Sequence, residues 1–213
     1  MPQLDVYMTT GLFSTAYFAP VHYFWHMNQM EEVVIEAYEH YIKQTWRNRC
    51  TIATANGPMT LSLPIETGPM EKVNIRDVKV SSHGNWQHLH WNSIESAYRS
   101  SPFFEYYQDD LRPFFEKKPG FLFDFNEEIR ETICGLIEFQ PKVNLSSEYL
   151  AEDVLPLGWL DFRTRIHPKK ELQDTGFHPT AYYQVFDRKF GFLPNLSILD
   201  LVFNMGPESV LYL

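Results

Sequence analysis

The sequence predicts one α/β domain, in which a strand-rich N-terminal part packs against helices from the C-terminal part. Three observations support this prediction. A strand–helix–strand pattern occupies residues 6–37, a hairpin pattern follows it, and apolar residues at helical spacing prevail after residue 86. With 213 residues and 44% hydrophobic composition, the chain can bury roughly 70% of its unfolded surface in a single core.

The first unit is a strand–helix–strand pattern. Residues 6–13 are rich in side chains that favour strands. Pro20 suits the first turn of a helix, which apolar residues on one side extend to about Met30. Residues 31–37 enclose a Val-Val-Ile run that is typical of a buried strand. Such a unit usually makes the two strands parallel neighbours.

A hairpin and one further strand are expected next. Residues 49–55 and 58–65 form two extended runs around Asn56-Gly57, the strongest hairpin signal in the chain. Residues 75–80 are expected to form another strand after a loop rich in Gly and Pro. This gives about five strands in the first 80 residues.

The middle of the chain predicts three helices. The first begins near Trp86 and stops before Pro102. The second covers residues 103–115 and bends or ends near Pro113. The third is expected to start at Asn126, whose side chain suits a helix cap.

The C-terminal part predicts an irregular segment and one last helix. Residues 140–180 lack periodicity and hold many Pro, Gly and charged residues, so we expect a variable excursion or lid within the one domain. The last helix spans residues 196–205, with Asn195 as its cap and Gly206-Pro207 as its terminator.

Charge and hydropathy exclude several function classes. The net charge of −9 repels phosphate backbones and anionic lipids, so we expect no nucleic-acid partner. No run of 18 apolar residues exists and the N-terminus does not resemble a signal peptide, which predicts no membrane insertion and a cytoplasmic location. The two cysteines form no metal or redox motif and are expected to be buried thiols.

A basic segment stands out in this acidic chain. Lys43 and Arg49 enclose Trp46 and Asn48, in a loop that is expected near the carboxyl ends of strands, where α/β proteins bind ligands. The two cations suit a phosphate, a carboxylate or a nucleotide-sugar pyrophosphate, and Asn48 suits a sugar hydroxyl or a base edge. The alternative is that the cations of this segment pair with neighbouring acidic residues such as Glu36 or Glu39.

His90 is the candidate catalytic residue. An imidazole titrates near neutral pH and can act as a general base. The alternative is a half-buried, hydrogen-bonded histidine between a helix and the sheet. His83 and His88 lie nearby, but their spacing does not suit a metal, so no metal site is expected.

Asp200 is the third candidate. It lies in an apolar segment, on one helix face with Ser197 and Asn204, and a carboxylate there is either paired or at a functional edge. A cleft lined by this polar stripe is one interpretation. Burial of Asp200 beside Arg49 is the other.

Ordered motifs along the chain resemble the WbqC-like family, in particular its Bacteroides-type members. The residues that carry the resemblance are Ser14 through Phe18, Tyr23-Phe24, Lys43 through Arg49, Trp86, His90-Trp91, Ala97 through Phe104, Pro194 through Asp200, and Gly206-Pro207-Glu208. Many members share a His-Gln-Pro-x-Tyr element after the first strand. Here Tyr17 matches its Tyr, and Phe13, Ser14 and Thr15 replace the His, Gln and Pro.

The resemblance implies a role in surface-polysaccharide biosynthesis in bacteria. The function expected from it is binding of an anionic small molecule, a nucleotide or nucleotide-sugar, with a sugar-modifying transferase as the enzymatic form. The ligand-binding candidates are then Tyr17, Lys43, Trp46, Asn48, Arg49, Asn195 and Asp200. The alternative is a non-catalytic protein that docks onto a polysaccharide-assembly enzyme, which the missing histidine favours and an exposed patch of Trp46, Trp86 and Trp91 would mark.

Overall fold

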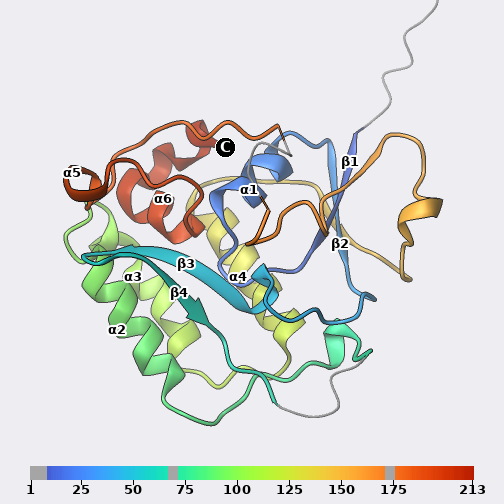
Figure 1. The fold of residues 1–213 in the computed structure, drawn as a ribbon, viewed down its shortest axis with the longest axis horizontal. Helices are drawn as coiled ribbons and strands as arrows, with labels where there is room; N and C mark the ends of the chain where they lie inside the picture. Colours follow the sequence, from blue (N-terminus) through green and yellow to red (C-terminus); the bar gives the residue numbers. More distant parts are fainter. Residues whose placement is uncertain (1–8, 67–71, 171–175) are drawn as a thin grey trace, which may run out of the picture.

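The computed structural model describes residues 9–66, 72–170 and 176–213. Its centre is a parallel four-stranded sheet with the order β5-β2-β1-β6. The strands are β1 (Thr10–Ser14), β2 (Glu32–Glu36), β5 (Val143–Leu145) and β6 (Trp159–Asp161). The α/β prediction is therefore confirmed, and β1 and β2 lie side by side in Figure 1.

The predicted strand–helix–strand unit is present. Helix α1 (Val21–Asn28) connects β1 to β2, and Thr10 pairs with Glu32 in parallel register. Residues 6–8 of the expected first strand lie outside the described residues. The Asn195 side chain caps α1 from a distant part of the chain, because its Oδ1 accepts a hydrogen bond of 3.1 Å from the His22 amide.

The two outer strands of this sheet come from residues 140–180, where we expected an excursion. Strand β5 pairs with β2 through Val33 and Val143, and β6 pairs with β1 through Thr10 and Trp159. Each outer strand has only three residues, which is too short to produce a periodic pattern in the sequence. This segment therefore supplies part of the central sheet.

The predicted hairpin is confirmed as β3 (Arg49–Thr54) and β4 (Gly57–Ser62), which pair antiparallel. Its loop is Ala55-Asn56, and Gly57 follows with a φ of 102° that favours glycine. The hairpin packs on α2 (Trp86–Tyr98), as Figure 1 shows, and the Ala53 amide donates to the Tyr98 hydroxyl at 3.1 Å.

The strand expected at residues 75–80 is absent. Residues Ile75–Asp77 form a 3-10 turn, η2, capped by Asn74, whose Oδ1 accepts from the Arg76 amide at 2.9 Å. Val80 makes only an isolated bridge, with Ile65. In the described part of the first 80 residues there are consequently four strands, and the prediction of about five was wrong by this one.

The helices follow the prediction with two corrections at their starts. Helix α4 begins at Leu122, so Asn126 lies inside it, fully buried, and donates from Nδ2 to the Arg47 carbonyl at 2.8 Å. Helix α6 is capped by Ser197, whose Oγ accepts from the Leu199 amide at 3.3 Å. The remaining bounds are α3 Phe104–Leu111, α4 Leu122–Leu136, α5 Asp187–Phe190, α6 Ile198–Met205, and the 3-10 helices η1 Trp46–Asn48, η3 Arg112–Phe115, η4 Glu152–Val154 and η6 Gly206–Tyr212.

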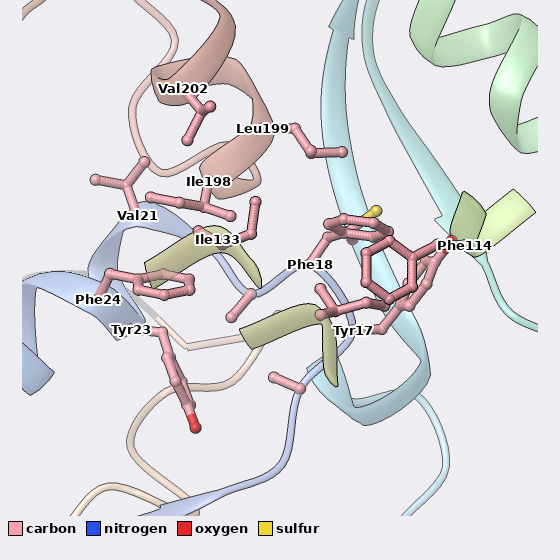
Figure 2. Close-up of a cluster of buried hydrophobic side chains, with 14 of the residues drawn as sticks. Tyr17, Phe18, Val21, Tyr23, Phe24, Phe114, Ile133, Ile198, Leu199 and Val202 are labelled. Carbon is pink, nitrogen blue, oxygen red and sulfur yellow. The ribbon is translucent and has the colours of Figure 1, made fainter. Parts of the chain in front are cut away.

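The core joins the crossover helix to the C-terminal helices. Figure 2 shows Val21 and Phe24 of α1 beside Ile198 and Val202 of α6, with Ile133 of α4 close by. Each such buried side chain contributes about 1.5–3 kcal/mol to stability. This packing fixes the sheet beneath the loops that follow its strands. In the described residues, no helix combines the length and the apolar character needed to cross a membrane.

Candidate functional site

Three strands of the parallel sheet end in polar or charged residues at one edge. Ser14 is the last residue of β1, Glu36 of β2 and Asp161 of β6. In the order β5-β2-β1-β6, the chain places β2 on one side of β1 and β6 on the other. The carboxyl ends of β1 and β6 therefore form a topological switch point, which is where open α/β sheets bind ligands.

Arg47 binds Glu39 and Ser14 at this edge. The short 3-10 helix η1 holds it, and its Nε donates to Glu39 Oε1 at 2.8 Å while its Nη2 donates to Glu39 Oε2 at 2.5 Å. Nη2 also donates to Ser14 Oγ at 2.6 Å, and Ser14 Oγ donates to Glu39 Oε2 at 3.0 Å. The side chains of Arg47 and Glu39 are only 4% and 6% exposed, which makes this a buried ion pair. The alternative in which this segment pairs with neighbouring acidic residues is thus confirmed for Arg47.

Arg163 connects the other two carboxylates. Its Nη2 donates to Asp161 Oδ2 at 2.6 Å and its Nη1 donates to Glu36 Oε2 at 3.1 Å. Burial by itself would lower the pKa of Arg163, but the hydrogen bonds and charges of Asp161 and Glu36 outweigh it and raise the pKa above the usual value. The Arg163 guanidinium therefore stays charged beside the sheet.

Glu36 also fixes the loop that follows β5. It is completely buried and accepts hydrogen bonds from Ser146 Oγ at 2.7 Å and from the Leu150 amide at 2.9 Å. Glu36 also holds the loop that follows its own strand, β2, because its Oε1 accepts a hydrogen bond of 2.9 Å from the Tyr38 amide. One carboxylate thus positions three segments around the edge, namely those after β2, β5 and β6.

A cavity of about 230 Å³ opens beside this network, which we call the edge cavity. Arg47, Arg163, Glu39 and Asp161 line it with His40, Ile42, Tyr149, Glu152 and Thr164. The Tyr149 ring is 56% exposed, and its centroid lies 5.5 Å from the Arg163 guanidinium carbon. The buried network contains three carboxylates and two guanidinium groups, so its formal charge is one negative unit. The edge cavity therefore offers both donors and acceptors, beside one aromatic face.

The WbqC-like protein family matches residues 15–160, more than half of the chain. The chain belongs to this family. The match starts directly after β1 and ends within β6, so it includes Glu36, Glu39 and Arg47, and Asp161 follows as the next residue. Most of the edge cavity is therefore built from the segment that defines a WbqC-like protein.

One curated relative is similar over nearly its whole length. Rv1507c, an uncharacterized protein of Mycobacterium tuberculosis, is 25% identical over 204 residues, which cover 86% of this chain and 88% of the relative. No solved structure matches the chain. The sequence comparisons thus show the family, and any inference about ligands has to come from the residues of the site.

The candidate residues of the basic segment do not share one site in this WbqC-like protein. Lys43 is exposed in the loop between β2 and β3, next to Ile42 of the edge cavity. Trp46 is half-buried and lines a small cavity at the end of β1. Asn48 is buried and donates from Nδ2 to the Leu63 carbonyl at 2.9 Å, and Arg49 is half-buried with its Nε unpartnered in the described residues. Lys43 and Trp46 thus remain near the edge, and Asn48 holds the start of the hairpin.

Tyr17 and His90 meet in the core. Tyr17 is completely buried, and its hydroxyl lies 2.9 Å from His90 Nδ1. Burial lowers the pKa of His90 to about 4, although a hydrogen bond with the Ser62 backbone opposes the shift. His90 is 6% exposed and packs edge-on against Trp86. The pair fits the interpretation of a hydrogen-bonded histidine at a helix–sheet junction.

Asp200 belongs to a separate buried cluster. Its Oδ2 accepts hydrogen bonds from the Tyr182 hydroxyl at 2.7 Å and from Gln184 Nε2 at 2.8 Å. Burial raises the pKa of Asp200 to about 6, and these hydrogen bonds limit the rise. Arg49 and Asp200, both within the described residues, form no ion pair. Asn195 acts as the cap of α1 described above.

The exposed tryptophan patch is not formed. Trp86 and Trp91 are 6% and 8% exposed and belong to the core. The structure also places no group of three or more potential metal ligands together in the described residues, and both cysteines are buried free thiols.

Sequence reasoning missed Asp161 and Arg163, and it considered Glu36 and Glu39 only as ion-pair partners. The available signal was an Asp-x-Arg pattern after a short apolar run. That signal becomes meaningful only once the run is known to be a strand beside β1, and three residues do not reveal this.

Proposed function

We propose that this WbqC-like protein binds a nucleotide-sugar in the edge cavity and acts in surface-polysaccharide biosynthesis. The observation that carries the proposal is the pair of buried guanidinium groups, Arg47 and Arg163, held by carboxylates beside a cavity at the switch point of the sheet. Keeping several charges buried is costly, and a network that borders a cavity is a candidate functional site. The pathway is supported by the family resemblance alone.

The arginines and Lys43 are assigned to the pyrophosphate. The hydrogen bonds that Arg47 makes to Glu39 and Ser14 use Nε and Nη2, so we assign its Nη1 as the donor to an anionic oxygen. Lys43 is exposed and follows the lining residue Ile42 in the chain, so we assign its flexible side chain to the rim as a further positive charge. Because Glu39 and Asp161 already neutralise the arginines, the anion gains directed hydrogen bonds more than a net positive field.

The carboxylates and Tyr149 are assigned to the sugar. Carboxylate oxygens of Glu39, Asp161 and Glu152 can accept hydrogen bonds from hydroxyl groups, and the exposed Tyr149 face can pack on the apolar side of a ring. The volume of about 230 Å³ is below the ~300–1,000 Å³ of pockets that enclose drug-sized ligands. The cavity therefore suits one part of a nucleotide-sugar, and the rest lies along its rim.

A sugar-modifying transferase is the enzymatic form of this proposal. Transfer to or from a sugar hydroxyl needs a proton acceptor within hydrogen-bond reach. His40 lines the edge cavity, whereas His90 is buried in the core with a hydroxyl partner. We therefore assign the general base to His40 in place of His90.

The test is a calorimetric titration with UDP-glucose, UDP-N-acetylglucosamine, GDP-mannose and dTDP-glucose. Tyr149→Ala and Glu152→Gln change the exposed rim and leave the buried ion pairs intact. Tyr106→Ala is the matched control, because Tyr106 is 78% exposed on α3. A ligand at 100 times its Kd should also add about 2.7 kcal/mol to the stability of the unsubstituted protein.

The expected result is binding of at least one nucleotide-sugar that weakens in both rim variants and is unchanged in Tyr106→Ala. Absence of binding across the panel would contradict the proposal. Capture of a polysaccharide-assembly enzyme by the same protein would then favour the docking alternative.

A further inference from the structure

A second cavity, of about 370 Å³, lies between α3, η3 and α4, and we call it the helical cavity. The loop of residues 117–121 closes one of its sides. It shares no lining residue with the edge cavity, so its chemistry is independent of the function proposed above. Its volume is within the ~300–1,000 Å³ range of small-molecule sites.

The floor of the helical cavity is aromatic and fixed. Phe114 and Phe125 are each 6% exposed, and their ring centroids lie 5.8 Å apart in an edge-to-face arrangement. Phe125 stacks on Tyr17 and Phe114 packs edge-on against Phe18, both of which are completely buried. Figure 2 shows Phe114 beside these two residues. The floor is thus an extension of the protein core and is formed before any ligand arrives.

The walls carry five charged side chains that form no ion pairs with one another. Asp110 lies on α3, and Asp124 and Glu128 lie one turn apart on α4. Lys117 and Lys118 lie on the connecting loop. Within the described residues, none of the five side chains forms an ion pair. The lining therefore has three carboxylates, two ammonium groups and a formal charge of −1.

We infer that the helical cavity binds a small amphipathic cation, an amine attached to an aromatic or aliphatic body. The faces of aromatic rings carry negative charge density, so the floor favours a cation over an anion where a face of Phe114 or Phe125 meets the cavity. All five charged residues are exposed, but the three carboxylates lie on helices, whereas the two lysines lie on a loop and have flexible, strongly hydrated side chains. The ligand body covers the phenylalanine floor, and its amine lies toward Asp124 and Glu128.

The opposite assignment, an anion at the N-terminus of α4, is disfavoured by the same residues. The helix dipole does favour negative charge there, but Asp124 in the first turn already supplies it. Phe121, which is 39% exposed, adds a further aromatic side chain to the lining. An anion would therefore meet the aromatic side chains and three carboxylates against two lysines, so the lining holds one more charge that repels it than charges that attract it.

Three probes with nearly the same body and different charge test the inference. They are 2-phenylethylamine, 2-phenylethanol and 3-phenylpropanoate, titrated separately and followed by amide chemical shifts. We expect the amine to bind more tightly than the alcohol and the alcohol more tightly than the carboxylate. Asp124→Asn combined with Glu128→Gln should weaken amine binding about tenfold, since each exposed charge pair contributes up to about 1 kcal/mol.

Asp109→Asn is the control, because Asp109 is exposed on α3 beside Asp110 but does not line the cavity. It should leave amine binding unchanged. The Lys117→Gln variant should strengthen it. Tighter binding of the carboxylate probe than of the amine, no amine binding, or equal weakening in Asp109→Asn would each overturn the inference.

Discussion

The carboxyl edge of the sheet and helix α6 both bury carboxylates, but they do so in different ways. At the edge, Glu39 and Asp161 are paired with arginines and border a cavity. On α6, Asp200 has the neutral partners Tyr182, Gln184 and Tyr98, and its pKa rises to about 6. At the edge, the carboxylates and their cations stand beside open space, which makes a candidate binding site. On α6, neutral side chains surround the carboxylate.

The largest expected effect is a difference in stability between losing a buried ion pair and losing an exposed ion pair at this sheet. Arg163→Ala leaves Glu36 and Asp161 without their cation, so we expect a loss of about 3–5 kcal/mol in the free energy of unfolding, measured with urea. Lys142→Ala is the control, since its pair with Glu32 is 62% exposed at Lys142 and should contribute no more than about 1 kcal/mol. Similar losses in the two variants would remove the distinction.

A pH series tests the α6 side of the comparison. The carboxyl of Asp200 has a pKa of about 6 in the fold against 3.8 ordinarily, so the folded state binds its proton more tightly. The resulting stability is present below pH ~4 and is lost as pH rises through 6, by about 3 kcal/mol in all. Asp200→Asn lacks this titration, so its unfolding free energy should gain about 3 kcal/mol relative to the unsubstituted protein between pH 4 and 7. A constant difference across that range would show that Asp200 is not desolvated.

The Tyr17–His90 pair should behave like the α6 cluster. Tyr17→Phe leaves His90 Nδ1 without its partner in the core, and we expect a loss of about 1–3 kcal/mol in stability. Binding at the edge cavity should not change, because neither residue lines it. Loss of ligand binding in a folded Tyr17→Phe protein would show that Tyr17 and His90 contribute to the functional site.

The smallest effect concerns Asn195, which we predicted as a ligand-binding residue and which caps α1. Asn195→Gly should cost about 1 kcal/mol through the lost cap, measured by urea unfolding. Asn195→Ala should cost about 1–2 kcal/mol more, since the φ of 58° at this position strains alanine. Equal losses would mean that the backbone conformation here contributes nothing.

The sequence predicted the fold better than the site. The crossover unit and the hairpin carry their signals locally, in Pro20 and in Asn56-Gly57, and both are confirmed. The site depends on which strands are neighbours, and β6 is too short for its own residues to indicate that Asp161 ends a strand beside β1. A polar residue in an apolar segment, such as Asp200, stands out in the sequence because burying it is costly. The same cost requires hydrogen-bond partners in the core, and here those partners are neutral.

The most direct test of the comparison is an amide chemical-shift map with the nucleotide-sugar panel. We expect the shifts to concentrate in residues 36–47 and 146–164 around the edge cavity and to become weaker in Tyr149→Ala at the same ligand concentration. Shifts centred instead on Arg49, His90 and Asp200 would contradict it and place the site in the region that we interpret as packing.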